Sequence, residues 1–279
     1  MIVQATYQLG RAQLAVGHLE NARRTWQDFL ASDVGKVDGG ALLAEAAYRL
    51  AHTYSVPAPG SIGDLELGVA AHESFLKAYP KSELAPQASL EIAQSYSHHG
   101  RYEQAVERLQ ALLKEVDAVA KQIPLARNLL GQALASQKKF VEAVAAWREF
   151  LDKHPSDPNW SNVQRVVIDT EYAMAEAQRL EKNYDAARTL WLTFLNKYPL
   201  DGRSPQILFL FGHMKSSEGI AQWQKEIEAA KADGAVLTKP LPPKAKTQKL
   251  FEEAIADLQQ LVKKYPNTEQ ASRAAFTIG

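Results

Sequence analysis

The chain closes helices with nearly the same short phrase four times, and this repetition limits its possible folds more than any other feature. The phrases are FLKAYP at residues 75–80, FLDKHP at 150–155, FLNKYP at 194–199 and LVKKYP at 261–266. Each phrase starts with apolar residues and ends in proline, which lacks the N–H group that a continuing helix needs. A chain that ends its helices in one way at four places is built from repeated helical units.

Small residues recur at fixed distances along the same units. An alanine or glycine lies 12 residues before each of the four prolines. A further small residue precedes such an alanine by 12 positions in the pairs Gly10/Ala22, Ala93/Ala105, Gly131/Ala143 and Ala175/Ala187. Antiparallel helices approach closely only where facing side chains are small, so this offset predicts tightly packed helix pairs. A non-repetitive helical bundle shares the 3.6-residue period but gives no reason for a constant offset.

One segment shows the whole pattern of apolar, small, aromatic and proline positions: Leu130-Gly131, Leu134, Ala143, Trp147, Phe150 and Pro155. It resembles the tetratricopeptide repeat (TPR) family, whose helix pairs recur about every 34 residues. The resemblance implies an all-α fold, a right-handed α-solenoid of about six helix pairs plus a final single helix. We expect one solenoid over residues 1–279, with units at about 3–31, 41–80, 86–115, 124–154, 168–199 and 205–266 and a last helix at 269–279.

Several insertions interrupt the expected spacing. Short ones fall at residues 35–40, 56–63 and 156–162, and a long one at 216–247 separates Gly212 from Ala254 by 42 residues where 12 are expected. The long insertion predicts a helix over 218–232 and an extended proline- and lysine-rich tail over 233–246. It is either a docking element or a cover for an exposed helix edge.

Composition narrows the classes of function. The 32 basic and 32 acidic residues give a formal net charge of zero, whereas nucleic-acid binding needs a basic excess. The absence of cysteine excludes disulfides and thiol nucleophiles. No apolar run approaches the length of a membrane span, so we expect no direct membrane insertion. Both ends interrupt helical patterns, which suggests a piece of a larger protein.

The sequence offers no constellation for catalysis. None of the seven histidines occurs in HExxH spacing, and no phosphate-binding loop or GxSxG motif is present. We therefore expect a protein that is not an enzyme, with no catalytic, metal or cofactor site. Trp26, Trp147 and Trp191 share one repeat position, which predicts that they are buried in the core. Trp160 and Trp223 fall in insertions and receive no role.

In TPR solenoids the first helix of each pair lines a concave wall, and the resemblance implies that a partner would bind there. The repeat register assigns to this wall Tyr7, Arg11, Tyr48, His52, Gln87, Leu90, Gln94, Asn128, Gln132, Tyr172, Glu176, Arg179, Phe209 and His213. Two interpretations stay open. The aromatic residues and amides could bind an extended peptide or a short helix, or the tyrosines could pack against the neighbouring unit and leave little groove.

These observations predict a non-catalytic scaffold that binds a protein or peptide. The alternatives are a structural spacer, a self-assembly module that forms homo-oligomers, and, as a lesser one, a glycan-binding accessory domain. The phrase at residues 79–88 (YPKSELAPQA) is similar to phrases in bacterial envelope TPR proteins, including the lipoprotein of outer-membrane β-barrel assembly and the periplasmic Tol-Pal coordinator. This resemblance implies a periplasmic or cell-envelope location for the parent protein.

Overall fold

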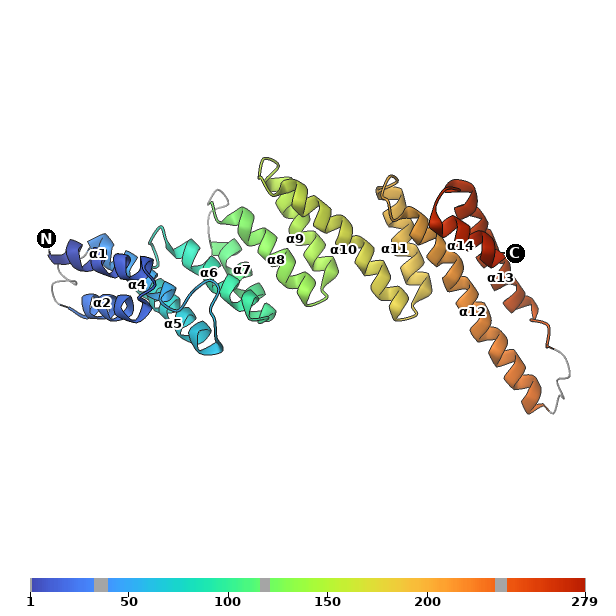
Figure 1. The fold of residues 1–279 in the computed structure, drawn as a ribbon, viewed down its shortest axis with the longest axis horizontal. Helices are drawn as coiled ribbons and strands as arrows, with labels where there is room; N and C mark the ends of the chain where they lie inside the picture. Colours follow the sequence, from blue (N-terminus) through green and yellow to red (C-terminus); the bar gives the residue numbers. More distant parts are fainter. Residues whose placement is uncertain (1, 33–39, 116–120, 234–239, 279) are drawn as a thin grey trace. The chain divides into compact units, whose positions relative to one another are not determined.

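The computed structural model describes residues 2–32, 40–115, 121–233 and 240–278, and within them all regular structure is helical (Figure 1). The helices are α1 (Ile2–Ala15), α2 (Leu19–Ala31), α4 (Gly40–His52), α5 (Ile62–Ala78), α6 (Ala85–His98), α7 (Tyr102–Glu115), α8 (Ile123–Ser136), α9 (Phe140–Lys153), α10 (Trp160–Leu180), α11 (Tyr184–Lys197), α12 (Ser204–Ala232), α13 (Ala245–Lys264) and α14 (Glu269–Ile278). The predicted all-α class is confirmed.

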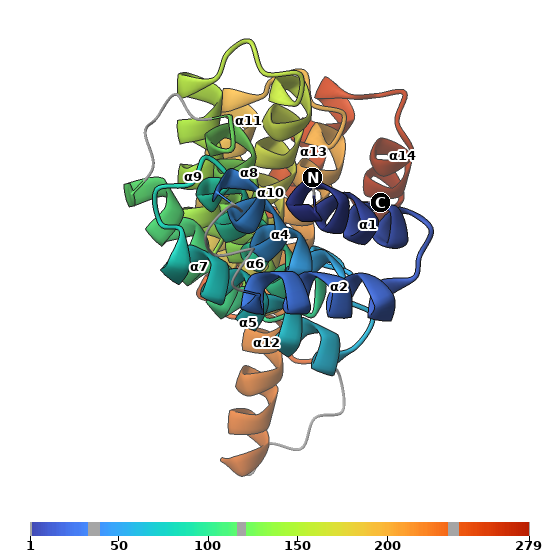
Figure 2. The same cartoon turned by 90° about the vertical axis from the view of Figure 1, so that its left-hand side faces the viewer.

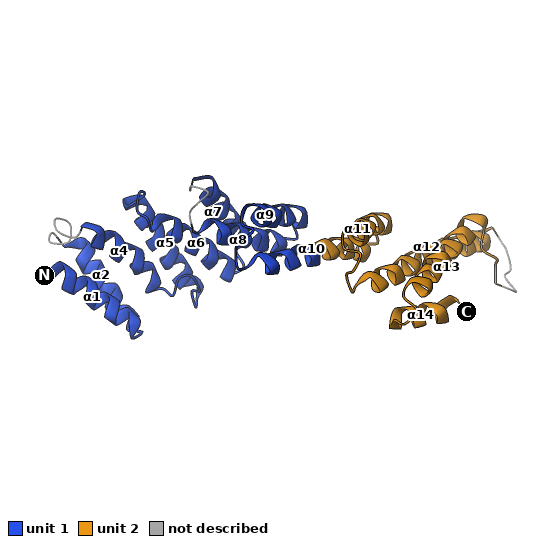
Figure 3. Ribbon diagram, turned by 90° about the horizontal axis from the view of Figure 1, so that it is seen from above, with its two compact units in different colours: residues 1–170 blue, residues 171–279 orange. Residues whose placement is uncertain are grey.

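Successive helices pack as antiparallel pairs. The most extensive contacts join α1 to α2, α4 to α5, α6 to α7, α8 to α9 and α12 to α13, and α7 packs as extensively on α8 of the next pair. The α1–α2 pair is visible from two directions (Figures 1 and 2). The chain divides into two compact units, residues 1–170 and residues 171–279 (Figure 3). Each unit is described separately below, and the single solenoid over 1–279 stays a prediction. Apart from Gly40, which begins α4, the predicted insertion at 35–40 lies outside the described residues.

The turn inside a helix pair has the same backbone geometry at four places. Its left-handed residue is Gly17, Gly100, Lys138 or Lys182, with φ between 61° and 78°. In each case the next residue donates its N–H to the carbonyl five positions earlier, at 2.8 to 3.0 Å, as in His18 to Gln13 and Lys139 to Leu134. This is the hydrogen bond of a Schellman helix end. The repeat is therefore reproduced down to individual backbone hydrogen bonds. Two of the four left-handed positions carry lysine, although only glycine adopts this conformation without strain.

The four proline phrases end their helices identically. Tyr79, His154, Tyr198 and Tyr265 follow α5, α9, α11 and α13 with φ between −134° and −126° and ψ between 55° and 64°. Each donates its N–H to the carbonyl of the residue four positions before it, and a proline comes next. The expectation that each phrase closes an apolar helix is confirmed.

The recurrent small residues lie where two helices of a pair touch. A β-carbon added at Gly131 would lie 2.4 Å from Trp147, and one added at Gly10 would lie 2.3 Å from Trp26. Trp26, Trp147 and Trp191 are almost completely buried, which confirms their predicted core position. Bulky rings thus fill the space that the small residues leave free.

Unit 2 contains one correction to the predicted insertion. Residues 218–232 do not form a separate helix but continue α12, which runs unbroken from Ser204 to Ala232. Of the described part of the predicted extended tail, Asp233 and residues 240–244 lie outside helices, while Ala245 and Lys246 begin α13. A β-carbon at Gly212 would lie 2.5 Å from Leu258 and 3.1 Å from the carbonyl of Ala254. The insertion therefore lengthens both arms of the α12–α13 pair and leaves its repeat contact in place.

Polar contacts close the outer part of this hairpin. The indole N–H of Trp223 donates to the carbonyl of Leu241 at 2.8 Å. The buried carboxylate of Glu226 accepts from the N–H of Lys244 at 2.9 Å and from the hydroxyl of Thr247 at 2.7 Å. Trp223, which had no role on sequence grounds, thus holds the returning chain against α12. Trp160 has a similar part in unit 1, where its indole donates to the carbonyl of Leu151 at 3.0 Å.

Candidate functional site

The predicted wall of unit 1 is formed by α1, α4, α6 and α8, but its most apolar members are covered. Tyr7, Tyr48 and Leu90 are 2%, 7% and 2% exposed. Tyr7 packs in a core cluster with Trp26, and Tyr48 packs with Phe75. For these three residues the structure corrects the expectation of a partner-contacting surface, because they fill the space between neighbouring helix pairs. Of the two interpretations left open by the sequence, packing against the neighbouring unit therefore applies to these three residues.

The polar members of the same wall remain accessible. Arg11 and Gln132 are exposed, while His52, Gln87, Gln94 and Asn128 are half-buried. Three of the amides contact one another or a neighbour along the row. Gln132 donates to Asn128 at 3.3 Å and Gln122 donates to Gln87 at 3.5 Å, and the indole of Trp147 donates to the Asn128 side chain at 3.1 Å. On α6 and α8, unit 1 therefore presents a row of four amide side chains, here called the amide row: Gln87, Gln94, Asn128 and Gln132.

A buried polar cluster lies beneath this row, at the junction of α4, α5 and α6. The Glu91 carboxylate is its centre. Its Oε1 accepts from the Tyr48 hydroxyl at 2.6 Å and from the Gln87 amide at 2.9 Å. Its Oε2 lies 2.9 Å from Nε2 of His52 and 2.9 Å from Nε2 of His72. An ionised carboxylate only accepts hydrogen bonds, so in the metal-free protein both imidazoles carry a proton on Nε2.

Burial and hydrogen bonding act in opposite directions on the groups of this cluster. Burial by itself raises the pKa of Glu91, but the hydrogen bonds from His52, His72, Tyr48 and Gln87 outweigh it and hold that pKa well below 4.5. Burial lowers the pKa of His72 below 6.5. Burial and the neighbouring Glu91 together raise the pKa of the Tyr48 phenol. At neutral pH the cluster therefore holds an ionised Glu91 carboxylate beside an uncharged His72 imidazole and an uncharged Tyr48 phenol.

Sequence spacing did not reveal this cluster, because its members come from three helices. Glu91 was not among the predicted wall residues, and His72 is one of the seven histidines that lack HExxH spacing. A signal was nevertheless present. His72 occupies the repeat position that holds Trp147 and Trp191 elsewhere, and that position is buried. A histidine in a core position needs a polar partner, and Glu91 supplies one on the adjacent first helix α6.

In unit 2 the predicted wall residues are arranged differently. Tyr172 is half-buried, and its ring centre lies 5.8 Å from that of Trp191. The Arg203 guanidinium lies over the Tyr172 ring, 4.9 Å from its centre. Glu176 and Arg179 form an ion pair within α10. The Phe209 ring lies under the Arg273 guanidinium at 4.9 Å, and His213 is exposed. The aromatic members here are partly covered by arginines.

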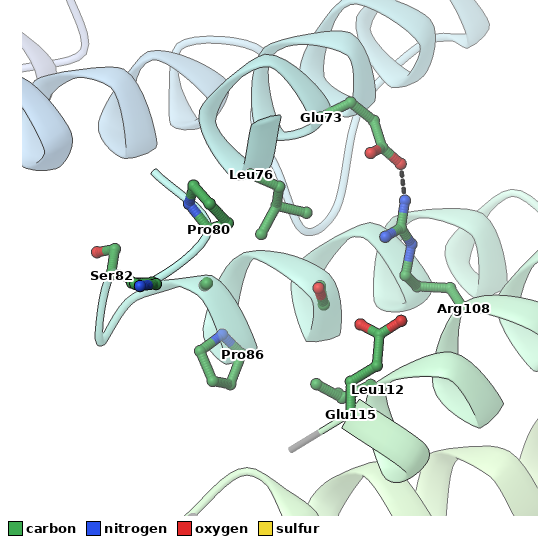
Figure 4. A pocket seen from close by; sticks show the side chains of 11 residues that line it. Glu73, Leu76, Pro80, Ser82, Pro86, Arg108, Leu112 and Glu115 are labelled. Carbon is green, nitrogen blue, oxygen red and sulfur yellow. Dashed lines mark ion pairs between the residues drawn. The ribbon is translucent and has the colours of Figure 1, made fainter. Parts of the chain in front are cut away.

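Unit 1 also has clefts on the side of its second helices. One of about 420 Å³ lies between α5 and α7, over the start of α6, and is lined by Leu76, Pro86 and Leu112 (Figure 4). An ion pair between Glu73 and Arg108 closes one side of it. A more apolar cleft of about 430 Å³ between α2 and α5 is lined by Leu30, Leu67 and Tyr79. The two clefts described here for unit 1 are therefore lined largely by its second helices.

Among the described residues, no helix combines the length and the apolar composition that crossing a bilayer requires.

Comparisons with known proteins agree with the repeat. One family model, described as tetratricopeptide repeat, matches residues 90–158, and a second with the same description matches 169–201 and 245–268. No curated protein matches the sequence.

Several solved structures are similar to this chain. A tetratricopeptide repeat protein from Parabacteroides merdae is 14% identical, with a TM-score of 0.45 over 99% of this chain and 98% of that one. PilF of Pseudomonas aeruginosa is 16% identical, with a TM-score of 0.40 over 99% and 97%. MamA from Desulfovibrio magneticus is 16% identical, with a TM-score of 0.42 over 72% and 97%. The family models therefore identify tetratricopeptide repeats at residues 90–158, 169–201 and 245–268 of this chain.

Proposed function

We propose that the chain is a non-catalytic scaffold whose unit 1 binds an extended segment of a partner protein along the amide row of α6 and α8. Tetratricopeptide repeats generally mediate protein–protein interaction, and solenoids use extended faces for it. The observation that carries the proposal is the accessibility of Gln94, Asn128 and Gln132 on consecutive first helices.

The chemistry of an amide row suits an extended backbone. A side-chain amide offers both a donor and an acceptor, and so does each peptide unit of a strand-like segment. Among the described residues, Gln94 has no hydrogen-bond partner within the protein, and Gln132 contacts only Asn128. Their capacity is thus free for a ligand, while the Trp147 indole holds the neighbouring Asn128 side chain.

A matched pair of double variants tests this surface. Gln94→Glu with Gln132→Glu removes the amide donors of the row at nearly constant shape. Gln104→Glu with Gln110→Glu makes the same change at exposed positions of α7, a second helix. Partners are captured from extracts of the source cell, and the affinity of the captured protein is then measured. We expect at least a tenfold loss for the row pair alone; equal binding by both folded variants rejects the site.

A spacer or self-assembly role is the second candidate, and the burial of Tyr7 and Tyr48 favours it, because the wall then has few aromatic anchors. Light scattering distinguishes its two forms, since self-assembly gives a mass that rises with concentration. The proposal also includes a bacterial cell-envelope setting, supported by the phrase at 79–88. Fractionation of source cells tests that setting, and recovery of the parent protein only in the cytosol contradicts it.

A further inference from the structure

Three potential metal ligands converge in unit 1 from three different helices. Nε2 of His52 on α4, Nε2 of His72 on α5 and a carboxylate oxygen of Glu91 on α6 all lie within 4.8 Å of one another. Both imidazole nitrogens are 2.9 Å from the same oxygen, Oε2. Two imidazoles and one carboxylate are a ligand set that zinc and related divalent transition metals use in proteins.

The distance from each imidazole nitrogen to the carboxylate oxygen suits an ion that both ligands share. With metal–ligand bonds of about 2.0–2.2 Å, atoms 2.9 Å apart subtend roughly 90° at the ion. Movement of the ligand atoms apart by ~0.4 Å brings the angle to the tetrahedral value that zinc prefers. A displacement of this size is a side-chain adjustment and leaves the three helices in place.

The carboxylate is oriented by groups that leave Oε2 to the imidazoles. The Tyr48 hydroxyl and the Gln87 amide both donate to Oε1. Metal-binding carboxylates are commonly held in this way by outer hydrogen bonds. The Tyr48 ring also confines both imidazoles, with its centre 4.9 Å from that of His52 and 5.3 Å from that of His72. Tyr48 and Gln87 would thus act as positioning residues.

The cluster is enclosed on one side and open on the other. The side chains of His72 and Glu91 are 0% and 8% exposed, whereas that of His52 is 20% exposed. An ion can therefore enter beside His52, and a water molecule can occupy a remaining coordination position there.

We propose that His52, His72 and Glu91 form a binding site for a divalent transition metal of the zinc class, with solvent as a further ligand. Each neutral imidazole binds the ion through Nε2 after its proton has moved from Nε2 to Nδ1, so no net loss of protons from the two rings is needed. The site joins the second helix pair to the third, so a bound ion stabilises their junction. The site shares Gln87 with the amide row but none of Gln94, Asn128 and Gln132, and its test with a metal salt does not depend on the partner.

Zinc chloride titrated into the metal-free chain, without a histidine tag, tests the proposal by calorimetry. Cobalt chloride serves as a second probe, because its visible absorption reports bound nitrogen ligands. We expect one equivalent of zinc per chain and a rise of the melting temperature with zinc. His52→Gln should weaken binding at least about tenfold, since it removes a ligand but keeps an amide that can donate to Glu91. Tyr48→Phe should weaken it by about tenfold through the loss of one outer hydrogen bond.

His98→Gln is the matched control, because His98 is an exposed histidine of α6 outside the cluster. It should bind zinc like the parent chain. Failure of the folded parent to take up zinc overturns the proposal and leaves the cluster as a hydrogen-bonded network only. Equal zinc affinity in the parent and His52→Gln overturns it as well.

Discussion

The indole of Trp147 lies directly against the backbone of Gly131, where an added β-carbon would meet ring atoms at 2.4 Å. Gly131→Ala therefore forces the buried ring to move, and we expect the free energy of unfolding to fall by about 1–3 kcal/mol. Gly63→Ala is the control, because an added methyl group there is near nothing but Ser61 at 3.8 Å and should be neutral or slightly stabilising. Urea denaturation measures both; equal effects would contradict close packing at Gly131.

Lys138 occupies the left-handed turn position that Gly100 holds in the preceding helix pair, with φ of 61° and 70° respectively. This backbone conformation is strained for any residue with a β-carbon. Lys138→Gly should raise the free energy of unfolding by about 0.5–1 kcal/mol, and Gly100→Lys should lower it by about 1 kcal/mol. Thermal melts of the two variants check the opposite signs, and a shift of both in one direction would argue against this turn geometry.

Arg188 and Asp257 join α11 to α13 within unit 2 through two hydrogen bonds of 2.6 and 2.9 Å. The guanidinium also lies over the Phe211 ring at 4.4 Å. Bidentate pairs that are mostly removed from water are stronger than exposed ones, so a double-mutant cycle with Arg188→Ala and Asp257→Ala should give a coupling of about 1.5–3 kcal/mol. The exposed pair Arg24 and Glu20 should give less than about 0.5 kcal/mol. Similar couplings for both pairs would refute the argument.

His154 accepts a hydrogen bond from Arg127 at 2.8 Å, so its Nε2 is unprotonated. Burial first, and then the Arg127 charge, lower the pKa of His154 below 6.5. His154 consequently binds a proton more readily in the unfolded chain than in the folded chain. The free energy of unfolding therefore decreases as the pH falls below about 6.5. His154→Tyr, which installs the residue of the other three phrases, should flatten the decline of melting temperature between about pH 7 and pH 5. Parallel curves for parent and variant would exclude this contribution.

Glu226 closes the outer part of the α12–α13 hairpin through Lys244 and Thr247. These two hydrogen bonds hold its pKa below 4.5. Glu226→Gln should accelerate amide exchange in the first turn of α13, because the neutral amide accepts more weakly than a carboxylate. The exposed Glu228 provides the matched change, Glu228→Gln, which should leave exchange there unaltered. Hydrogen–deuterium exchange followed by mass spectrometry resolves the segment; equal exchange in both variants would show that Glu226 has no closing role.

Helix ends and core contacts were predictable because they depend on nearby residues. The proline after Tyr79 or Tyr198 cannot continue the helix that precedes it, and a small residue at position 131 leaves the space that the Trp147 ring fills. The wall was less predictable, because burial of Tyr48 depends on Phe75 and Glu91 in other helices. The same register made both Tyr7 and Arg11 wall residues, although only the second is exposed. Repeat position locates a side chain on a helix, whereas its exposure is decided by its neighbours.

The lengthened α12–α13 pair shows how a repeat protein can evolve a helix pair that projects further. Residues added at the far end of an antiparallel hairpin extend both arms equally, and each pair of added residues lengthens the arm by about 1.5 Å. Because the Gly212–Leu258 contact persists despite the insertion, arm length is independent of the packing that defines the repeat. Selection can therefore change how far this arm extends from unit 2 without redesigning the helices that carry it.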